Sequence, residues 1–127
     1  MEKFTKFARL AETEFPDIVI STHDLGHKLR VYLKDKSFID FFYSTKSKIT
    51  RFAIHWERVH LDGNFYRLDN TPDKNWSKVK TYPLHFHDKI YENVTSSPFE
   101  SKNKTLLSIF RQFLNFVLNK SWLTKSS

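Results

Sequence analysis

Apolar and polar residues alternate through the middle of this chain, and this period of two is typical of strands that bury one face. The alternating segments cover residues 28–34, 37–44, 51–60 and 64–70. The chain has only two glycines, Gly26 and Gly63, and each lies in a predicted hairpin turn. Glycine supplies the positive φ that such turns need. The pattern therefore predicts an antiparallel meander.

Helical spacing replaces this alternation at both ends of the chain. Apolar residues recur at helical intervals over residues 4–15, as far as Pro16, and again over residues 105–119. The second of these segments has an apolar surface broad enough for burial on two sides, by the sheet and by another helix or subunit. One expectation is therefore a homodimer formed through the C-terminal helix.

The segments between these elements are shorter and less regular. They are a β-branched run at residues 18–20, a polar loop at 71–81, a short strand at 82–87 and a linker at 93–104. We therefore expect an α+β fold, with an antiparallel meander of five or six strands flanked by an N-terminal and a C-terminal helix. The length predicts a single domain over residues 1–127.

Missing residues and motifs exclude several classes of protein. Cysteine is absent, so there is no disulfide framework, thiolate zinc site or cysteine nucleophile. The chain has no Gly-rich phosphate loop, serine-hydrolase elbow or HExxH zinc motif. It shows no signal peptide, and no stretch approaches the roughly 18 apolar residues of a membrane span. We expect a cytoplasmic protein without a cofactor and without membrane contact.

The positive charge of the chain favours a polyanionic partner, either nucleic acid or an acidic protein. The net charge is +7, from 21 Lys and Arg against 14 Asp and Glu. Between residues 46 and 89, aromatic residues interleave with basic ones, which suits base stacking above a charged groove. The candidates for nucleic-acid binding are Arg51, Trp76, Lys78, Lys80 and Tyr82. Solvated lysines and core aromatics would give the same pattern.

Three histidines are candidates for chemistry. His85 and His87 are two residues apart, so their imidazoles leave the same face of a strand, and His55 lies on the polar side of its own strand. An imidazole titrates near neutral pH, so a pair on one face can share proton transfer or hold a metal ion. The structural alternative is one histidine bonded to a backbone carbonyl and the other exposed to solvent.

Polar residues that could support these histidines follow the second glycine. Arg67 and Asp69 share a face, and a carboxylate beside an imidazole orients it and raises its pKa, as general acid–base chemistry requires. Asn70 and Pro72 then end the strand, where turn capping is the structural alternative. We treat both, together with Pro83, as supporting residues. The whole hypothesis requires the strand of the paired histidines to lie beside this hairpin.

These motifs resemble the TumE-like family, small proteins known as toxins of toxin–antitoxin pairs. The resemblance covers residues 28–87, and the family pattern reads approximately RxDNxPHH followed by FPHHxH. The chain keeps Arg67, Asp69, Asn70, Pro72, Pro83, His85 and His87. It departs at Asp73, Lys74 and Leu84, which replace histidines. The loss of these histidines weakens any role that needs the full set, a multi-histidine metal site above all.

The resemblance implies a toxin that acts on RNA or translation and is neutralised by a small helix-turn-helix antitoxin. The residues suit metal-independent RNA cleavage, in which His85 or His87 is the base and the other, or His55, is the acid. Arg67, with Arg51, Lys78 or Lys80, would stabilise the charged phosphorane, and Asp69 would orient a histidine. Two alternatives stay open. One is a metal-dependent nuclease that uses Asp69, His85 and His87, with or without His55, and the other is a non-catalytic basic module that binds nucleic acid or an acidic protein.

Overall fold

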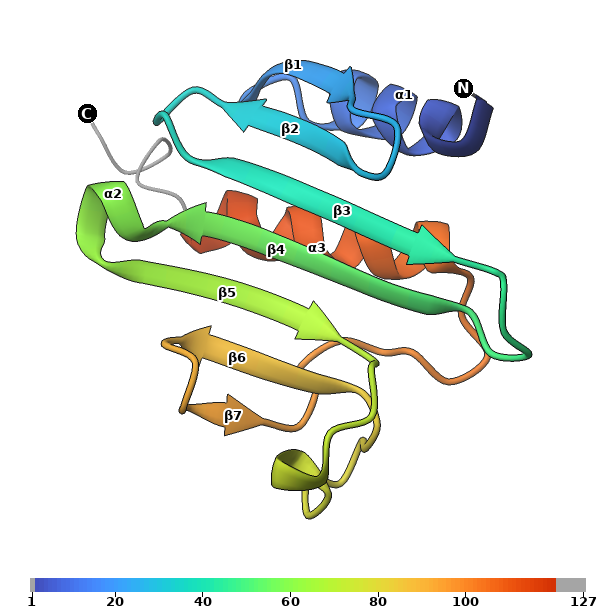
Figure 1. Cartoon of the computed structure of the whole chain (residues 1–127). Coiled ribbons are helices and arrows are strands. Elements are labelled where there is room, and N and C mark those ends of the chain that lie inside the picture. The colour runs from blue at the N-terminus through green and yellow to red at the C-terminus, as the bar shows by residue number, and fades with distance from the viewer. Residues whose placement is uncertain (1, 121–127) are drawn as a thin grey trace. The chain divides into compact units, whose positions relative to one another are not determined.

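The computed structural model describes residues 2–120, which divide between two compact units. Of these residues, the first unit comprises 2–38 and 99–120, and the second comprises Ile39–Pro98. Together they carry the elements labelled in Figure 1. The predicted α+β class, with a helix near each end and antiparallel strands between them, is confirmed.

The first unit combines two helices with a hairpin. Its elements are the 3₁₀ turn η1 (Glu2–Phe4), helix α1 (Thr5–Glu14), strands β1 (Val19–Asp24) and β2 (Leu29–Leu33), and helix α3 (Leu106–Lys120). The hairpin is antiparallel, and Gly26 has the positive φ of 89° that its turn requires.

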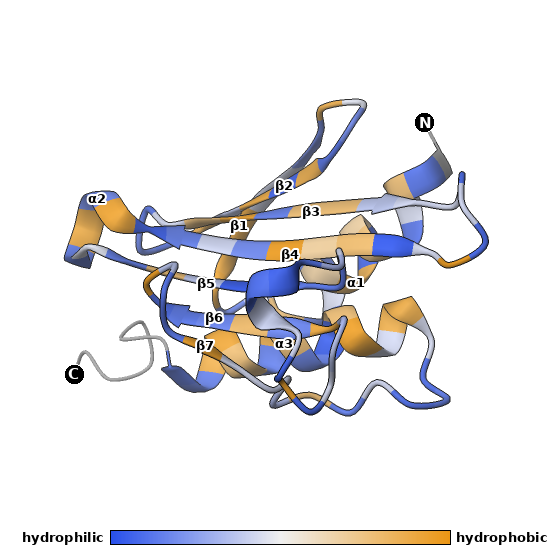
Figure 2. Ribbon diagram, turned by 60° about the horizontal axis from the view of Figure 1, so that its bottom comes forward, coloured by the Kyte–Doolittle hydropathy of each residue, from blue (hydrophilic) through white to orange (hydrophobic). Residues whose placement is uncertain are grey.

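Aromatic packing and one ion pair join the two helices of this unit. Phe7 of α1 meets Phe110 of α3 edge to face, with ring centroids 5.4 Å apart. At the exposed rim, Arg111 donates two hydrogen bonds, of 2.8 and 3.0 Å, to the carboxylate of Glu14. The buried stripe of α3 follows the predicted spacing and consists of Ile109, Phe110, Phe113, Leu114 and Val117. Figure 2 shows this stripe and the polar face of α3 as alternating orange and blue bands. A homodimer through α3 stays a prediction.

The second unit is a meander. Its strands β3 (Phe38–Ser44), β4 (Arg51–Arg58), β5 (Asn64–Asp69), β6 (His85–Lys89) and β7 (Val94–Thr95) lie side by side in chain order. Trp56 stands opposite Tyr66, and Leu68 stands opposite Phe86. These side chains belong to the buried apolar face, which leaves the odd-numbered residues of β4, β5 and β6 on the other face.

The number of strands and the start of one strand differ from the prediction. The described residues contain seven strands rather than five or six, because Val94–Thr95 pairs with β6 inside the segment predicted to be a linker. The strand expected at 82–87 begins instead at His85. Residues 81–84 form a turn in which the N–H of Leu84 donates to the carbonyl of Thr81 at 2.9 Å, so they cannot join the ladder.

The connection between β4 and β5 is wider than the predicted tight turn. A single helical turn, α2 (Val59–Asp62), precedes Gly63, which has a φ of 78°. Arg58, almost fully buried, donates from Nε to Asp62 at 3.0 Å and lies over the Trp56 ring. The other carboxylate oxygen of Asp62 accepts from the N–H of Asn64 at 3.1 Å, so this side chain ties the start of β5 to the end of β4. None of the described helices is long and apolar enough to cross a membrane.

Replacing Gly63 tests this connection. A Cβ at this position would meet open space, so only the left-handed backbone opposes a side chain. Gly63→Ala should lower the free energy of unfolding by about 1–2 kcal/mol, and Gly63→Asn by less because asparagine tolerates the left-handed region. Urea unfolding of the three proteins measures both effects. Equal stability of the alanine variant and the wild type would contradict this account of the turn.

Candidate functional site

Strand register gathers the predicted site residues of the second unit on one face. Arg67 pairs with His87 and Asp69 with His85 across β5 and β6, while His55 of β4 pairs with Arg67 on its other side. Because residues paired across antiparallel strands share a face, all five side chains leave the sheet on the same side. The juxtaposition on which the site hypothesis depends is therefore present.

A pocket of about 210 Å³ opens on this face. It is lined by Arg67, Asp69, Thr71, Pro72, Asp73, Trp76, His85, His87 and Tyr91. Four of the five predicted catalytic residues are in this set, and His55 is outside it. Thr71, Asp73 and Tyr91 were not predicted from the sequence, because each reaches the pocket from a loop whose path no local pattern indicates.

Both pocket histidines have their tautomer set by a backbone carbonyl. Nδ1 of His85 lies 2.9 Å from the oxygen of Pro83, and Nδ1 of His87 lies 2.8 Å from the oxygen of Tyr91. A carbonyl only accepts, so each Nδ1 carries the proton, and in the neutral ring Nε2 has the lone pair. Each side chain is only 3% exposed, and the ring centroids are 5.0 Å apart.

Burial favours the neutral form of His87. Desolvation is the main cause that lowers its pKa below the ordinary histidine value, and the nearby His85 and Arg67 lower it further. The hydrogen bond to the Tyr91 carbonyl and the charge of Asp69 act in the opposite direction. At neutral pH this imidazole is therefore a proton acceptor at Nε2.

The partners of Asp69 differ from the prediction that this carboxylate orients a histidine. One oxygen of Asp69 accepts from Nε of Arg67 at 3.1 Å, and the other accepts from the N–H of Thr71 at 2.7 Å. Backbone carbonyls orient the histidines instead. Asp69 therefore fixes the guanidinium of Arg67 at the pocket.

His55 lies in the same polar network, although it does not line the pocket. Nη1 of Arg67 lies 3.4 Å from Nδ1 of His55, and Nε2 of His55 lies 2.9 Å from Glu57. A guanidinium only donates hydrogen bonds, so Nδ1 of His55 is the acceptor. The N–H at Nε2 therefore donates a hydrogen bond to the carboxylate of Glu57. Burial is the main cause that lowers the pKa of His55, with the hydrogen bond to Glu57 acting against it. Both ring nitrogens of His55 therefore have hydrogen-bond partners, and a catalytic role of His55 stays a prediction.

Asn70 joins the ends of two strands. Its side-chain oxygen accepts from the N–H of Phe52 at 2.9 Å, and its amide nitrogen donates to the carbonyl of Thr50 at 2.8 Å. Arg51, predicted to bind nucleic acid, donates from Nη1 to the Asn70 carbonyl at 2.9 Å. Both side chains therefore join the ends of β4 and β5, and neither of them lines the pocket.

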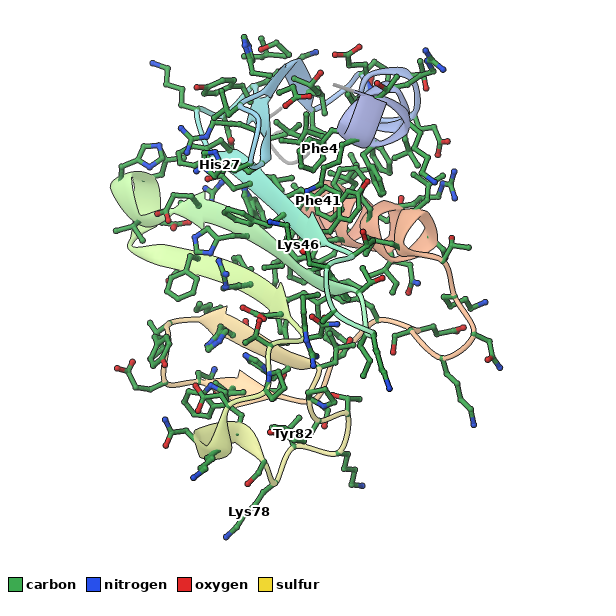
Figure 3. All side chains as sticks on the ribbon, turned by 45° about the vertical axis from the view of Figure 1, so that its right-hand side comes forward. Phe4, His27, Phe41, Lys46, Lys78 and Tyr82 are labelled. Atoms are coloured by element: carbon green, nitrogen blue, oxygen red, sulfur yellow. The ribbon has the colours of Figure 1, made fainter. Side chains whose placement is uncertain are left out.

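The loop between β5 and β6 covers the histidines. The Trp76 ring, in the 3₁₀ turn η2 (Lys74–Trp76), lies with its centroid 5.8 Å from that of His87 and 6.4 Å from that of His85. Lys78, Lys80 and Tyr82 are exposed on the same loop, and Figure 3 shows Lys78 extending away from the sheet. Pro72 lines the pocket, and Pro83 supplies the carbonyl that His85 binds.

Ligands for a metal ion are not assembled at this face. Across residues 2–120, no group of three or more His, Cys, Asp and Glu side chains could hold a metal ion. Asp69, which the metal-dependent alternative requires as a ligand, is paired with Arg67.

Comparison with known proteins identifies the family. The model of the family described as Toxin TumE matches residues 4–121, almost the whole chain. The chain belongs to the TumE toxin family. No curated protein and no solved structure matches it. Membership in the TumE family makes this protein a toxin of a toxin–antitoxin system, with an antitoxin as its partner.

The buried histidines of this TumE toxin predict acid sensitivity. Because the pKa values of His55 and His87 are lowered in the folded protein, unfolding takes up protons below the ordinary histidine pKa. The free energy of unfolding should have its full value above about pH 6.5 and should fall as the pH drops below that value. Thermal melts from neutral to acidic pH measure the slope. His87→Asn should reduce this slope, and a slope unaffected by His87→Asn would contradict the assignment.

Proposed function

We propose that this toxin cleaves RNA by histidine acid–base catalysis at the pocket between β5, β6 and the loop that joins them. The observation that carries the proposal is the pair of imidazoles whose Nδ1 protons are held by the Pro83 and Tyr91 carbonyls. This arrangement leaves two Nε2 atoms on one face, beside a guanidinium that lines the same pocket. Two proton-transfer groups and a cation are what phosphodiester cleavage by a neighbouring hydroxyl requires.

His87 suits the role of base. Its pKa is lowered, so neutral Nε2 can take the proton from the ribose 2′-hydroxyl as that oxygen attacks phosphorus. The bond from phosphorus to the 5′-oxygen then breaks, and His85, which enters the reaction as the protonated imidazolium, gives its Nε2 proton to the departing oxygen. The products would be a 2′,3′-cyclic phosphate and a 5′-hydroxyl.

Arg67 suits the stabilisation of the charged phosphorane. Its guanidinium is about a third exposed, at 31%, and Asp69 and His55 hold it from two directions. A cation fixed before the reaction stabilises developing charge without reorganising. The pocket is smaller than the roughly 300–1,000 Å³ of sites for drug-sized ligands, so it suits a phosphate and part of its ribose.

Asparagine substitutions at the two histidines test the mechanism. The asparagine amide lies near the position of Nδ1 and can still donate to the carbonyl, but nothing replaces Nε2. His85→Asn and His87→Asn should each lower the rate of RNA cleavage by roughly 10²–10⁴-fold in the presence of EDTA, with little change in melting temperature. The matched control is His60→Asn, at an exposed position outside the pocket.

The measurement is cleavage of RNA by the purified protein, with the product ends identified and toxicity followed by bacterial growth. Unchanged RNA in the presence of a folded, growth-inhibiting protein would reject the cleavage mechanism and favour the non-catalytic binding module. Activity lost on chelation and restored by a divalent metal ion would favour the metal-dependent alternative.

Substitutions at Arg67 and Asp69 test the proposed stabilisation of the phosphorane by the guanidinium of Arg67. Arg67→Ala should lower the rate of cleavage by roughly 10²–10³-fold, as expected for loss of one preorganised donor to the transition state. Arg67→Lys should recover only part of this loss, because an ammonium lacks the planar fork that binds Asp69 and His55 together. Asp69→Asn should have a smaller effect, because the amide oxygen can still accept from Thr71. Full activity of Arg67→Ala would remove this residue from the mechanism.

A further inference from the structure

A second cavity adjoins the histidine pocket. It has a volume of about 350 Å³ and lies between the β5–β6 loop and the segment around β7. Its lining consists of Lys74, Asn75, Trp76, Ser77, Lys78, Val79, Glu92 and Val94. Trp76 lines both cavities, so whatever fills the second one lies next to the proposed site of cleavage.

The indole of Trp76 is held in place although it is only half-buried. The side chain of Asp73 accepts from the N–H of Asn75 at 2.9 Å, and the carbonyl of Asp73 accepts from the N–H of Trp76 at 2.9 Å. The ring meets Tyr91 edge to face at 5.6 Å between centroids, and meets His87 in the same manner. A flat aromatic surface is thus fixed at the wall of the second cavity.

We propose that this cavity is a nucleobase subsite, in which the base of the nucleotide next to the cleaved phosphate stacks on Trp76. The choice of RNA as ligand rests on the function proposed above. Stacking on a positioned aromatic side chain is the usual way in which proteins bind an unpaired base. Lys74 and Lys78, exposed on the same loop, would attract the flanking phosphates.

The lining favours a base over a phosphate as the occupant. The carboxylate of Glu92 can accept from the N–H groups on the edge of a base, which a phosphodiester does not have. Val79 and Val94 offer apolar contact to a ring, and Asn75 and Ser77 add polar groups of both kinds. The ligand would be single-stranded, because bases in a duplex are stacked on one another and closed to this surface.

Binding of RNA by the His87→Asn variant tests the subsite without cleavage. The probe is a short, fluorescent single-stranded RNA, and a series of copies carries one abasic nucleotide at each position in turn. Trp76→Ala should weaken binding roughly 5- to 150-fold, the range that the loss of one stacked base gives. Trp76→Phe should recover part of the affinity. Tyr32→Ala, at an aromatic residue that is 39% exposed in the other unit, is the matched control and should change nothing.

The abasic series separates stacking from a structural role of the tryptophan. With Trp76 present, one abasic position should weaken RNA binding by about the same factor as Trp76→Ala does. In the Trp76→Ala variant, the same abasic position should weaken binding no further. Equal affinity of Trp76→Ala and the parent, or an abasic penalty that persists in Trp76→Ala, would overturn the inference. RNA cleavage without such coupling would support the proposed function and reject the nucleobase subsite. Coupled binding by a protein that never cleaves RNA would reject catalysis and keep the subsite.

Discussion

Antiparallel pairing of β5 with β6 is the constraint on which the rest of the candidate site depends. The register sets Arg67 opposite His87 and Asp69 opposite His85. A slip of one residue would turn these side chains to the apolar face and bring Leu68 and Phe86 to the polar one. Burial of Leu68 and Phe86 therefore enforces the register, and the hydrophobic effect indirectly aligns the polar groups. The geometry of the candidate site is in this sense a consequence of core packing.

Backbone carbonyls then set the tautomer of the two buried imidazoles. A buried polar group is stable only when it is hydrogen-bonded, and the carbonyls of Pro83 and Tyr91 meet that need at Nδ1. The same bonds present Nε2 to the pocket. The Trp76 ring lies beside both imidazoles, and burial lowers the pKa of His87 and so favours its neutral form. The loop between β5 and β6 thus works both as a cover and as a source of specificity in the function proposed here.

A second polar network supports the cation. Glu57, His55, Arg67 and Asp69 form a continuous series of hydrogen bonds across β4 and β5. Each donor in the series meets an acceptor, so the guanidinium is held without a histidine or carboxylate having to change protonation state.

Local sequence patterns were sufficient for the α+β class, the helix at each end, most strands and the face shared by His85 and His87, because periodicity reports which side of an element is buried. Tertiary structure alone decided the hydrogen-bond partners of the site residues. Asp69 binds Arg67 rather than an imidazole, Asn70 ties two strands together, and Tyr91 reaches His87 from a turn that has no distinctive pattern. Strand β7 was also missed, because two residues are too short to show alternation. Hydrogen bonds between residues distant in the chain follow from register and loop path, which no local spacing encodes.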